Sequence, residues 1–181
     1  MGYNLYIGEA EAVIYMEDRH ARMGVKVVDG KDFGAPINSS LNYSNFCYPS
    51  YGVWANFADQ TGIYSVFYAP RCPNGHKISH GRCPSSCKLC EGGRKSVYWI
   101  PEGKDKAQER EGLLANHPGC FELTPDHLIA FEAAREAWKA KPEEERLDED
   151  DVDWALRRLD WLCFWTKWAL DTCKYPSFAN S

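Results

Sequence analysis

The sequence has no hydrophobic run long enough to cross a membrane. A bilayer span needs roughly 20 apolar residues in a row, and even the uncharged stretch from residue 33 to residue 58 is rich in Asn and Ser. The first ten residues include Glu9 and no basic segment, so they do not match a secretory signal. We therefore expect a cytoplasmic protein with no membrane partner.

The sequence also lacks the short motifs of common active sites. It contains no phosphate-binding glycine loop, no Gly-x-Ser-x-Gly and no His-Glu-x-x-His. The zinc deaminase signature fails because neither His76 nor His80 is followed by Glu two positions later. Cys47 could act as a nucleophile with His117 or His127 as its general base. An isolated Cys among aromatic residues, however, is more often buried and inert. Catalysis is therefore the less favoured class of function.

Cysteine, tryptophan and tyrosine are abundant. The 181 residues include 8 Cys, 7 Trp and 10 Tyr, with 44% hydrophobic and 26% charged residues and a net charge of -5. This length and composition are typical of one globular domain, so residues 1–181 are treated as a single domain. In a reducing cytoplasm, cysteines favour metal binding and buried thiols over a disulfide framework.

Local patterns predict an α+β fold that begins with a small antiparallel sheet. Residues 3–7, 11–16 and 24–28 form β-branched and aromatic runs separated by turn-forming residues, which predicts a meander. Ser50 is placed to cap a short helix that carries Tyr51, Trp54 and Phe57. Residues 62–69 are predicted to be a strand that pairs with residues 96–100, which would make the cysteine-rich stretch between them a hairpin loop.

The C-terminal third predicts a two-helix hairpin over about residues 124–174. Thr124, Pro125 and Asp126 form a start signal, and the apolar residues from Leu128 to Trp138 then share one face before Pro142. A second helix should begin near residues 148–150 and continue to about Cys173, before Pro176. Its tryptophans form a stripe that indicates a buried core helix, packed against the first.

Six potential metal ligands lie between residues 72 and 90. Two ligands separated by two to four residues can bind zinc from one tight turn. Cys87-Lys-Leu-Cys90 has this spacing, and Cys72-Pro-Asn-Gly-His76 supplies a second pair in which Gly75 tolerates a turn. Two such turns that face each other would complete a zinc site.

These residues resemble the zinc-ribbon and zinc-knuckle elements of many intracellular proteins. The resemblance covers about 20 residues and implies a structural Zn²⁺ bound by Cys72, His76, Cys87 and Cys90 within a finger at about residues 71–95. Such elements often end in Cys-Pro-x-Cys, whereas here two serines follow Cys83-Pro84. Cys83 or His80 could therefore substitute for one of the four ligands.

Charge is distributed unevenly along the chain. Residues 71–95 contain six Lys or Arg and one acid, so Lys77, Arg82 and Lys88 are candidate phosphate contacts of a basic finger, although part of this charge compensates zinc-bound thiolates. Residues 143–153 contain eight acids and only Arg146 as a base. Most of these acids precede the last helix or lie in its first turn, where the helix dipole favours them.

The uncharged segment from Pro36 to Phe57 combines amides with aromatic rings. Such a surface suits a protein partner, a nucleobase or another neutral polar ligand; the alternative is a loop whose Asn and Ser bind their own backbone. The candidate ligand-binding or partner-binding residues are Asn38, Asn42, Tyr43, Asn45, Tyr48 and Tyr51.

The leading hypothesis is a zinc-containing cytoplasmic protein that binds a macromolecular partner, most plausibly another protein. Accessory proteins of phages or mobile elements offer an analogy in size. The first alternative is a small hydrolase that acts on a nucleotide-like substrate through the Asn and Tyr segment. The second is nucleic-acid binding through the basic finger.

Overall fold

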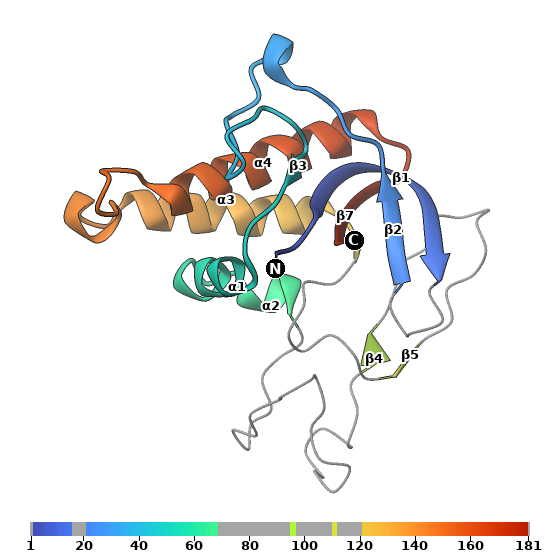
Figure 1. The fold of residues 1–181 in the computed structure, drawn as a ribbon, viewed down its shortest axis with the longest axis horizontal. Helices are drawn as coiled ribbons and strands as arrows, with labels where there is room; N and C mark the ends of the chain where they lie inside the picture. The colour runs from blue at the N-terminus through green and yellow to red at the C-terminus, as the bar shows by residue number, and fades with distance from the viewer. Residues whose placement is uncertain (1, 16–20, 69–94, 97–109, 112–120, 181) are drawn as a thin grey trace, which may run out of the picture.

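A computed structural model describes residues 2–15, 21–68, 95–96, 110–111 and 121–180. It confirms an α+β fold with an antiparallel sheet and a C-terminal helix pair (Figure 1). Residues 71–94 of the predicted zinc finger lie outside the described residues, and they include its ligands and the candidate phosphate contacts Lys77, Arg82 and Lys88. The described part contains no helix that is both long and apolar enough to span a bilayer.

The sheet is built on one long strand. Strand β1 (Leu5–Tyr15) is continuous, so the predicted break at Gly8-Glu9 is wrong. Its first half pairs with β7 (Pro176–Asn180) and β3 (Phe46–Cys47), and its second half pairs with β2 (Ala21–Val25). A register shift between Ala10 and Ala12 accompanies the strong bend of β1 that is visible in Figure 1. One strand therefore replaces the first two members of the predicted meander.

The C-terminal strand was not predicted. Strand β7 lies between β1 and β6 (Phe121–Glu122), and Phe178, which pairs with Ile7 and with Phe121, is fully buried. In the sequence, Pro176 indicates only where the preceding helix ends. Pro176 stands at the first position of the strand, which is one of the places where a sheet tolerates proline.

The strand predicted at residues 62–69 is wrong. The chain forms the short helix α2 (Tyr64–Phe67), and the ring of Tyr64 stacks on that of Tyr68, the residue after the helix, with centroids 4.5 Å apart. Ile63 and Phe67 are buried, and their spacing of four residues suits a helix rather than a strand. The pairing with residues 96–100 is also wrong where it can be checked, because β4 (Lys95–Ser96) pairs with β5 (Arg110–Glu111).

The predicted helices are confirmed. Helix α1 (Tyr51–Gln60) follows Ser50, and α3 (Pro125–Lys139) follows Thr124, whose side chain forms a capping box with His127. Helix α4 (Trp154–Thr172) begins after Asp153, later than predicted. The reason is local: the Asp148 carboxylate accepts hydrogen bonds from the backbone of Asp150 and Val152, which holds those residues in a separate turn.

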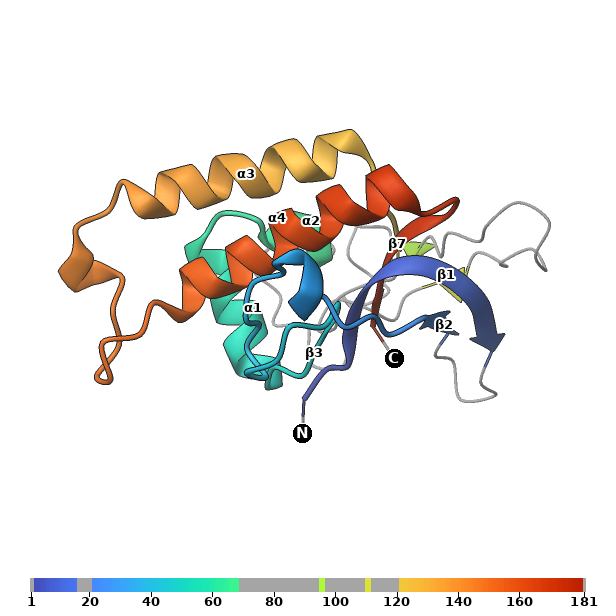
Figure 2. The same cartoon turned by 90° about the horizontal axis from the view of Figure 1, so that it is seen from above.

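Helix α4 forms the centre of the core. It packs along α3 and against β1 and β7, and in both views it lies between α3 and the segment that leads to β3 (Figures 1 and 2). Trp161 and Trp165 are fully buried, whereas Trp154 and Trp168 are partly exposed. The prediction of a largely buried tryptophan stripe is therefore confirmed for its middle members.

Candidate partner-binding surface

The side chain of Asn38 holds the loop that precedes β3. Its amide nitrogen donates to the Asn42 side chain (2.6 Å) and to the backbone carbonyls of Ser44 (3.2 Å) and Phe46. Its amide oxygen accepts from the backbone N–H of Ser40 (2.7 Å). Because Asn38 is fully buried and all these partners belong to the loop or to the first residue of β3, the side chain fixes the loop conformation and has no donor left for a ligand.

Asn45 connects the loop to the sheet. Its amide nitrogen donates to the carbonyls of Ile7 and Lys26 (2.8 Å each), and its amide oxygen accepts from the N–H of Val28 (2.8 Å). The residue is fully buried. One side chain therefore joins β1, the chain after β2 and the loop itself.

Asn42 and Tyr43 also face the protein interior in part. The Asn42 oxygen accepts three hydrogen bonds, from Asn38 and from the backbone and hydroxyl of Ser44. Tyr43 is half-buried against the core. Of the six residues proposed from the sequence, Tyr48 and Tyr51 are the two that are exposed, and the Tyr51 ring lies 4.4 Å from that of Tyr3.

Many of the exposed side chains of this region are large and apolar, beside the exposed charged residues Asp29, Lys31 and Asp32 near its start. Among the residues that the structure describes, eight large hydrophobic side chains are exposed, and seven of them fall between residues 27 and 53. We call these seven the 27–53 surface, after the sequence segment that they share: Val27, Phe33, Ile37, Leu41, Tyr48, Tyr51 and Val53. Most of the segment is uncharged, because residues 33–58 contain no Lys, Arg, Asp or Glu.

Leu41 combines two unfavourable features. Its backbone has φ of 60°, in the left-handed region that bulky residues rarely adopt, and its side chain is 66% exposed. The Asn38 carbonyl accepts a hydrogen bond from the Leu41 N–H. The Asn38 side chain also forms hydrogen bonds on either side of Leu41, with the Ser40 N–H and with the Asn42 side chain. The loop therefore holds an apolar side chain in solvent in a fixed geometry, at a cost of about 1–2 kcal/mol for the backbone conformation.

Phe33 connects the 27–53 surface to the core helix. Its ring stacks on Phe164 and Trp168 of α4, with centroids 6.2 Å and 6.4 Å apart, and meets Trp165 edge-on. The indole N–H of Trp161 donates to the Ser44 carbonyl (2.9 Å). These contacts place the segment alongside α4, as Figure 2 shows, and make it a rigid part of the fold.

Cys47 and His127 do not form the nucleophile and general-base pair that the sequence allowed. Cys47 is buried, and burial raises the pKa of its thiol to about 12, so it is neutral at pH 7. The Nδ1 atom of His127 contacts the backbone N–H and the hydroxyl of Thr124 at 3.0 Å, within the helix cap. His117 lies outside the described residues, where the pairing stays a prediction.

No group of three or more His, Cys, Asp or Glu that could hold a metal ion occurs among the described residues. No protein family, curated protein or solved structure matches the chain. The physical features of the 27–53 surface therefore carry the functional argument.

Proposed function

We propose that this chain is a zinc-containing protein that acts by binding another protein through the 27–53 surface. The observation that carries the proposal is the concentration of exposed apolar side chains in one largely uncharged segment. Interface cores are depleted in charge and enriched in aromatic and apolar residues, which is the composition found here. The alternatives of a hydrolase or a nucleic-acid binder have no comparable support among the described residues.

The rigidity of the loop supports the same proposal. Ordering a flexible loop on binding costs free energy, and a loop that is already fixed avoids this cost. Asn38 and Asn45 fix the loop by hydrogen bonds to its backbone and to the sheet. The exposed side chains are therefore presented in one arrangement, as expected of a preorganised binding surface.

Leu41→Asp is expected to abolish capture of the native partner while the protein stays folded. The change places a charge at the most exposed member of the 27–53 surface, where a partner would have to desolvate it. Ile129→Asp is the matched control, because Ile129 is equally apolar and 63% exposed but lies on α3. Affinity capture from the cells in which the protein occurs, compared by quantitative mass spectrometry, measures the difference. Equal capture by both variants would contradict the proposal.

The zinc finger predicted from Cys72, His76, Cys87 and Cys90 belongs to the same proposal. We expect elemental analysis of the purified protein to find zinc at a single ion per chain, because two closely spaced ligand pairs complete a tetrahedral site. Replacing Cys87 and Cys90 together with Ser should remove the metal, whereas replacing the buried Cys163 with Ser should not. A metal-free protein in which all cysteines react freely with a thiol reagent would overturn this part of the proposal.

A further inference from the structure

Arg158 is a largely buried cation without a counter-charge. It lies on α4, and its Nε atom is buried without a hydrogen-bond partner in the part of the chain that the structure describes. Every ion pair seen in the described ranges involves other residues. A guanidinium stays charged at any ordinary pH, so burial cannot be relieved by loss of a proton. A buried donor without an acceptor is costly, and the Nε atom of Arg158 therefore stands out.

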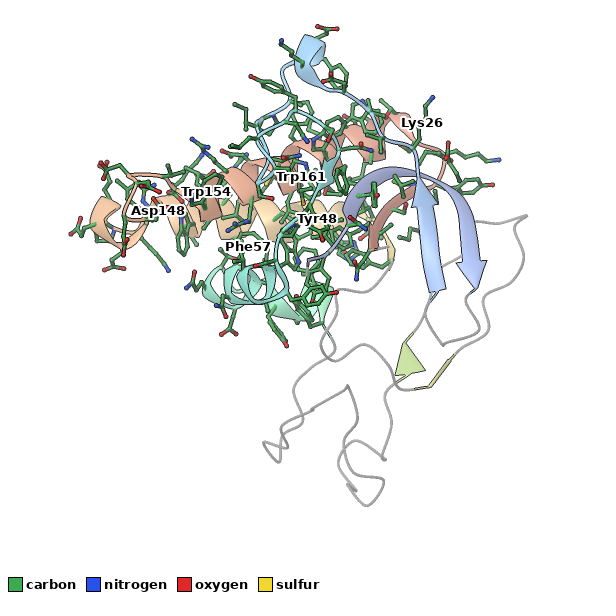
Figure 3. The ribbon with its side chains drawn as sticks, viewed as in Figure 1. Lys26, Tyr48, Phe57, Asp148, Trp154 and Trp161 are labelled. Atoms are coloured by element: carbon green, nitrogen blue, oxygen red, sulfur yellow. The ribbon has the colours of Figure 1, made fainter. Side chains whose placement is uncertain are left out.

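The residues around Arg158 provide no anion. Its Cζ atom lies 5.7 Å from the centre of the Phe57 ring, and the neighbouring Cys47 thiol is neutral at pH 7, as its raised pKa shows. Figure 3 shows Phe57 on α1 beside the part of α4 that carries Trp154 and Trp161. The nearest acids on α4 are bound elsewhere: Asp153 to Arg146 at 2.7 Å, and Asp160 to Arg135 at 3.8 Å.

Arg157 adds a second cation beside the first. Its guanidinium lies over the Trp154 ring, with Cζ 5.0 Å from the centroid, and it forms no ion pair with a described residue. The side chain is half-buried. Both arginines therefore pack on aromatic rings without a carboxylate among the described residues, and Arg158 is the one that contacts α1, through Phe57.

We propose that Arg158 is a carboxylate-binding site that receives an acidic side chain of the protein partner. This inference rests on the proposed function. A guanidinium is a planar fork that matches a carboxylate with two parallel hydrogen bonds, and an aromatic surrounding strengthens such a pair by excluding water. A nucleic acid would require a row of cations along its phosphates, whereas residues 33–60, which supply the opposing loop and α1, contain no Lys or Arg.

The direct test titrates the protein with sodium acetate and follows the Nε–Hε signal of Arg158 by NMR at constant ionic strength and pH 7. We expect a saturable shift in the millimolar range with acetate and none with sodium chloride. Arg158→Lys keeps the charge but removes the planar guanidinium. In this variant the backbone amide signals near position 158 should no longer show a saturable response to acetate. The matched control Arg135→Lys changes an arginine that already faces Asp160, and it should leave the response intact. A shift that never saturates, or one equal in chloride, overturns the proposal.

Two further results decide the ligand and separate this inference from the proposed function. Phosphate or a thymidine oligonucleotide that binds more tightly than acetate would overturn the assignment to a carboxylate. Arg158→Met should raise the melting temperature by about 2–4 °C, because an apolar side chain of similar length leaves no buried donor without an acceptor. A large decrease would overturn the proposal, because it would mean that the fold itself uses the guanidinium. Saturable acetate binding together with normal partner capture by Leu41→Asp would retain this site and reject the 27–53 surface.

Discussion

Asn45→Asp is expected to destabilise the protein by about 3–5 kcal/mol at pH 7, although the two side chains have nearly the same shape. The Asn45 amide nitrogen donates to the carbonyls of Ile7 and Lys26 in the buried interior. An ionised aspartate would direct a charged oxygen at these two carbonyl oxygens and could not donate to either. The free energy of unfolding by urea, measured for both proteins at several pH values, tests the prediction.

The loss should grow with pH. Burial and the two carbonyls favour the protonated acid, so the pKa of the introduced carboxyl in the folded protein should lie above its unfolded value of about 3.9. Below about pH 4 the acid is protonated in both states, and the loss is smallest. Above this pH the unfolded state ionises first, so stability should fall by about 1.4 kcal/mol per pH unit until the pKa of the folded state is reached.

Asn42→Asp is the matched control for this prediction. The Asn42 oxygen accepts three hydrogen bonds from Asn38 and Ser44, and a carboxylate can accept all of them. We therefore expect a loss below about 1 kcal/mol, with little growth as pH rises, because these donors stabilise the ionised form. Equal losses at positions 42 and 45, or a pH-independent loss at Asn45, would show that the amide donors of Asn45 do not hold the loop to the sheet.

These two positions also show how far the sequence could predict the candidate site. Composition identified residues 36–57 as unusual, and the structure places exposed apolar side chains there. The direction of the amides was not predictable, because Asn45 binds Ile7, which is 38 positions away in the sequence. The left-handed conformation of Leu41 follows from hydrogen bonds of Asn38 and likewise has no signature in the residue itself.

Whether an element of the fold was predictable likewise depends on whether nearby or distant residues determine it. The start of α3 was predictable because Thr124, Pro125 and His127 form the cap within one turn. Strand β7 was not, since it is short and gains its partners from β1, at the other end of the chain. The helix at residues 64–67 is likewise selected by burial of Ile63 and Phe67 in a core assembled from distant elements.

Leu41 and Arg158 depart from local rules without an evident structural gain. One is an exposed leucine in a left-handed conformation, and the other is a partly buried arginine whose buried Nε atom has no described acceptor. Proteins tend to retain such features at functional sites, where stability is lower than the fold allows. The two residues lie on separate elements, Leu41 in the loop before β3 and Arg158 on α4, so the experiments proposed above test them independently.

Asp153→Ala is expected to lower the free energy of unfolding by about 3–4 kcal/mol, because three groups lose their partner at once. The Asp153 Oδ1 atom accepts from the Leu156 N–H (2.8 Å), which caps α4, and from the indole N–H of Trp138 on α3 (2.9 Å). The Oδ2 atom accepts from Arg146 at 2.7 Å, in a pair whose side chains are only 18% and 11% exposed. Urea unfolding followed by near-ultraviolet circular dichroism, which reports on tryptophan packing, measures the loss.

Asp153→Asn separates the hydrogen bonds that this side chain accepts from Leu156 and Trp138 from its ion pair with Arg146. Its amide oxygen can still cap α4 and accept from Trp138, so the loss should be about half of that for alanine and should come mainly from Arg146. Replacing Arg146 with Met in the Asp153→Asn protein should then recover part of the stability, because no charge remains unpaired. If asparagine were as damaging as alanine, the whole contribution of Asp153 would come from its charge and its pair with Arg146. If asparagine had no effect, the contribution would come from the cap and the Trp138 hydrogen bond.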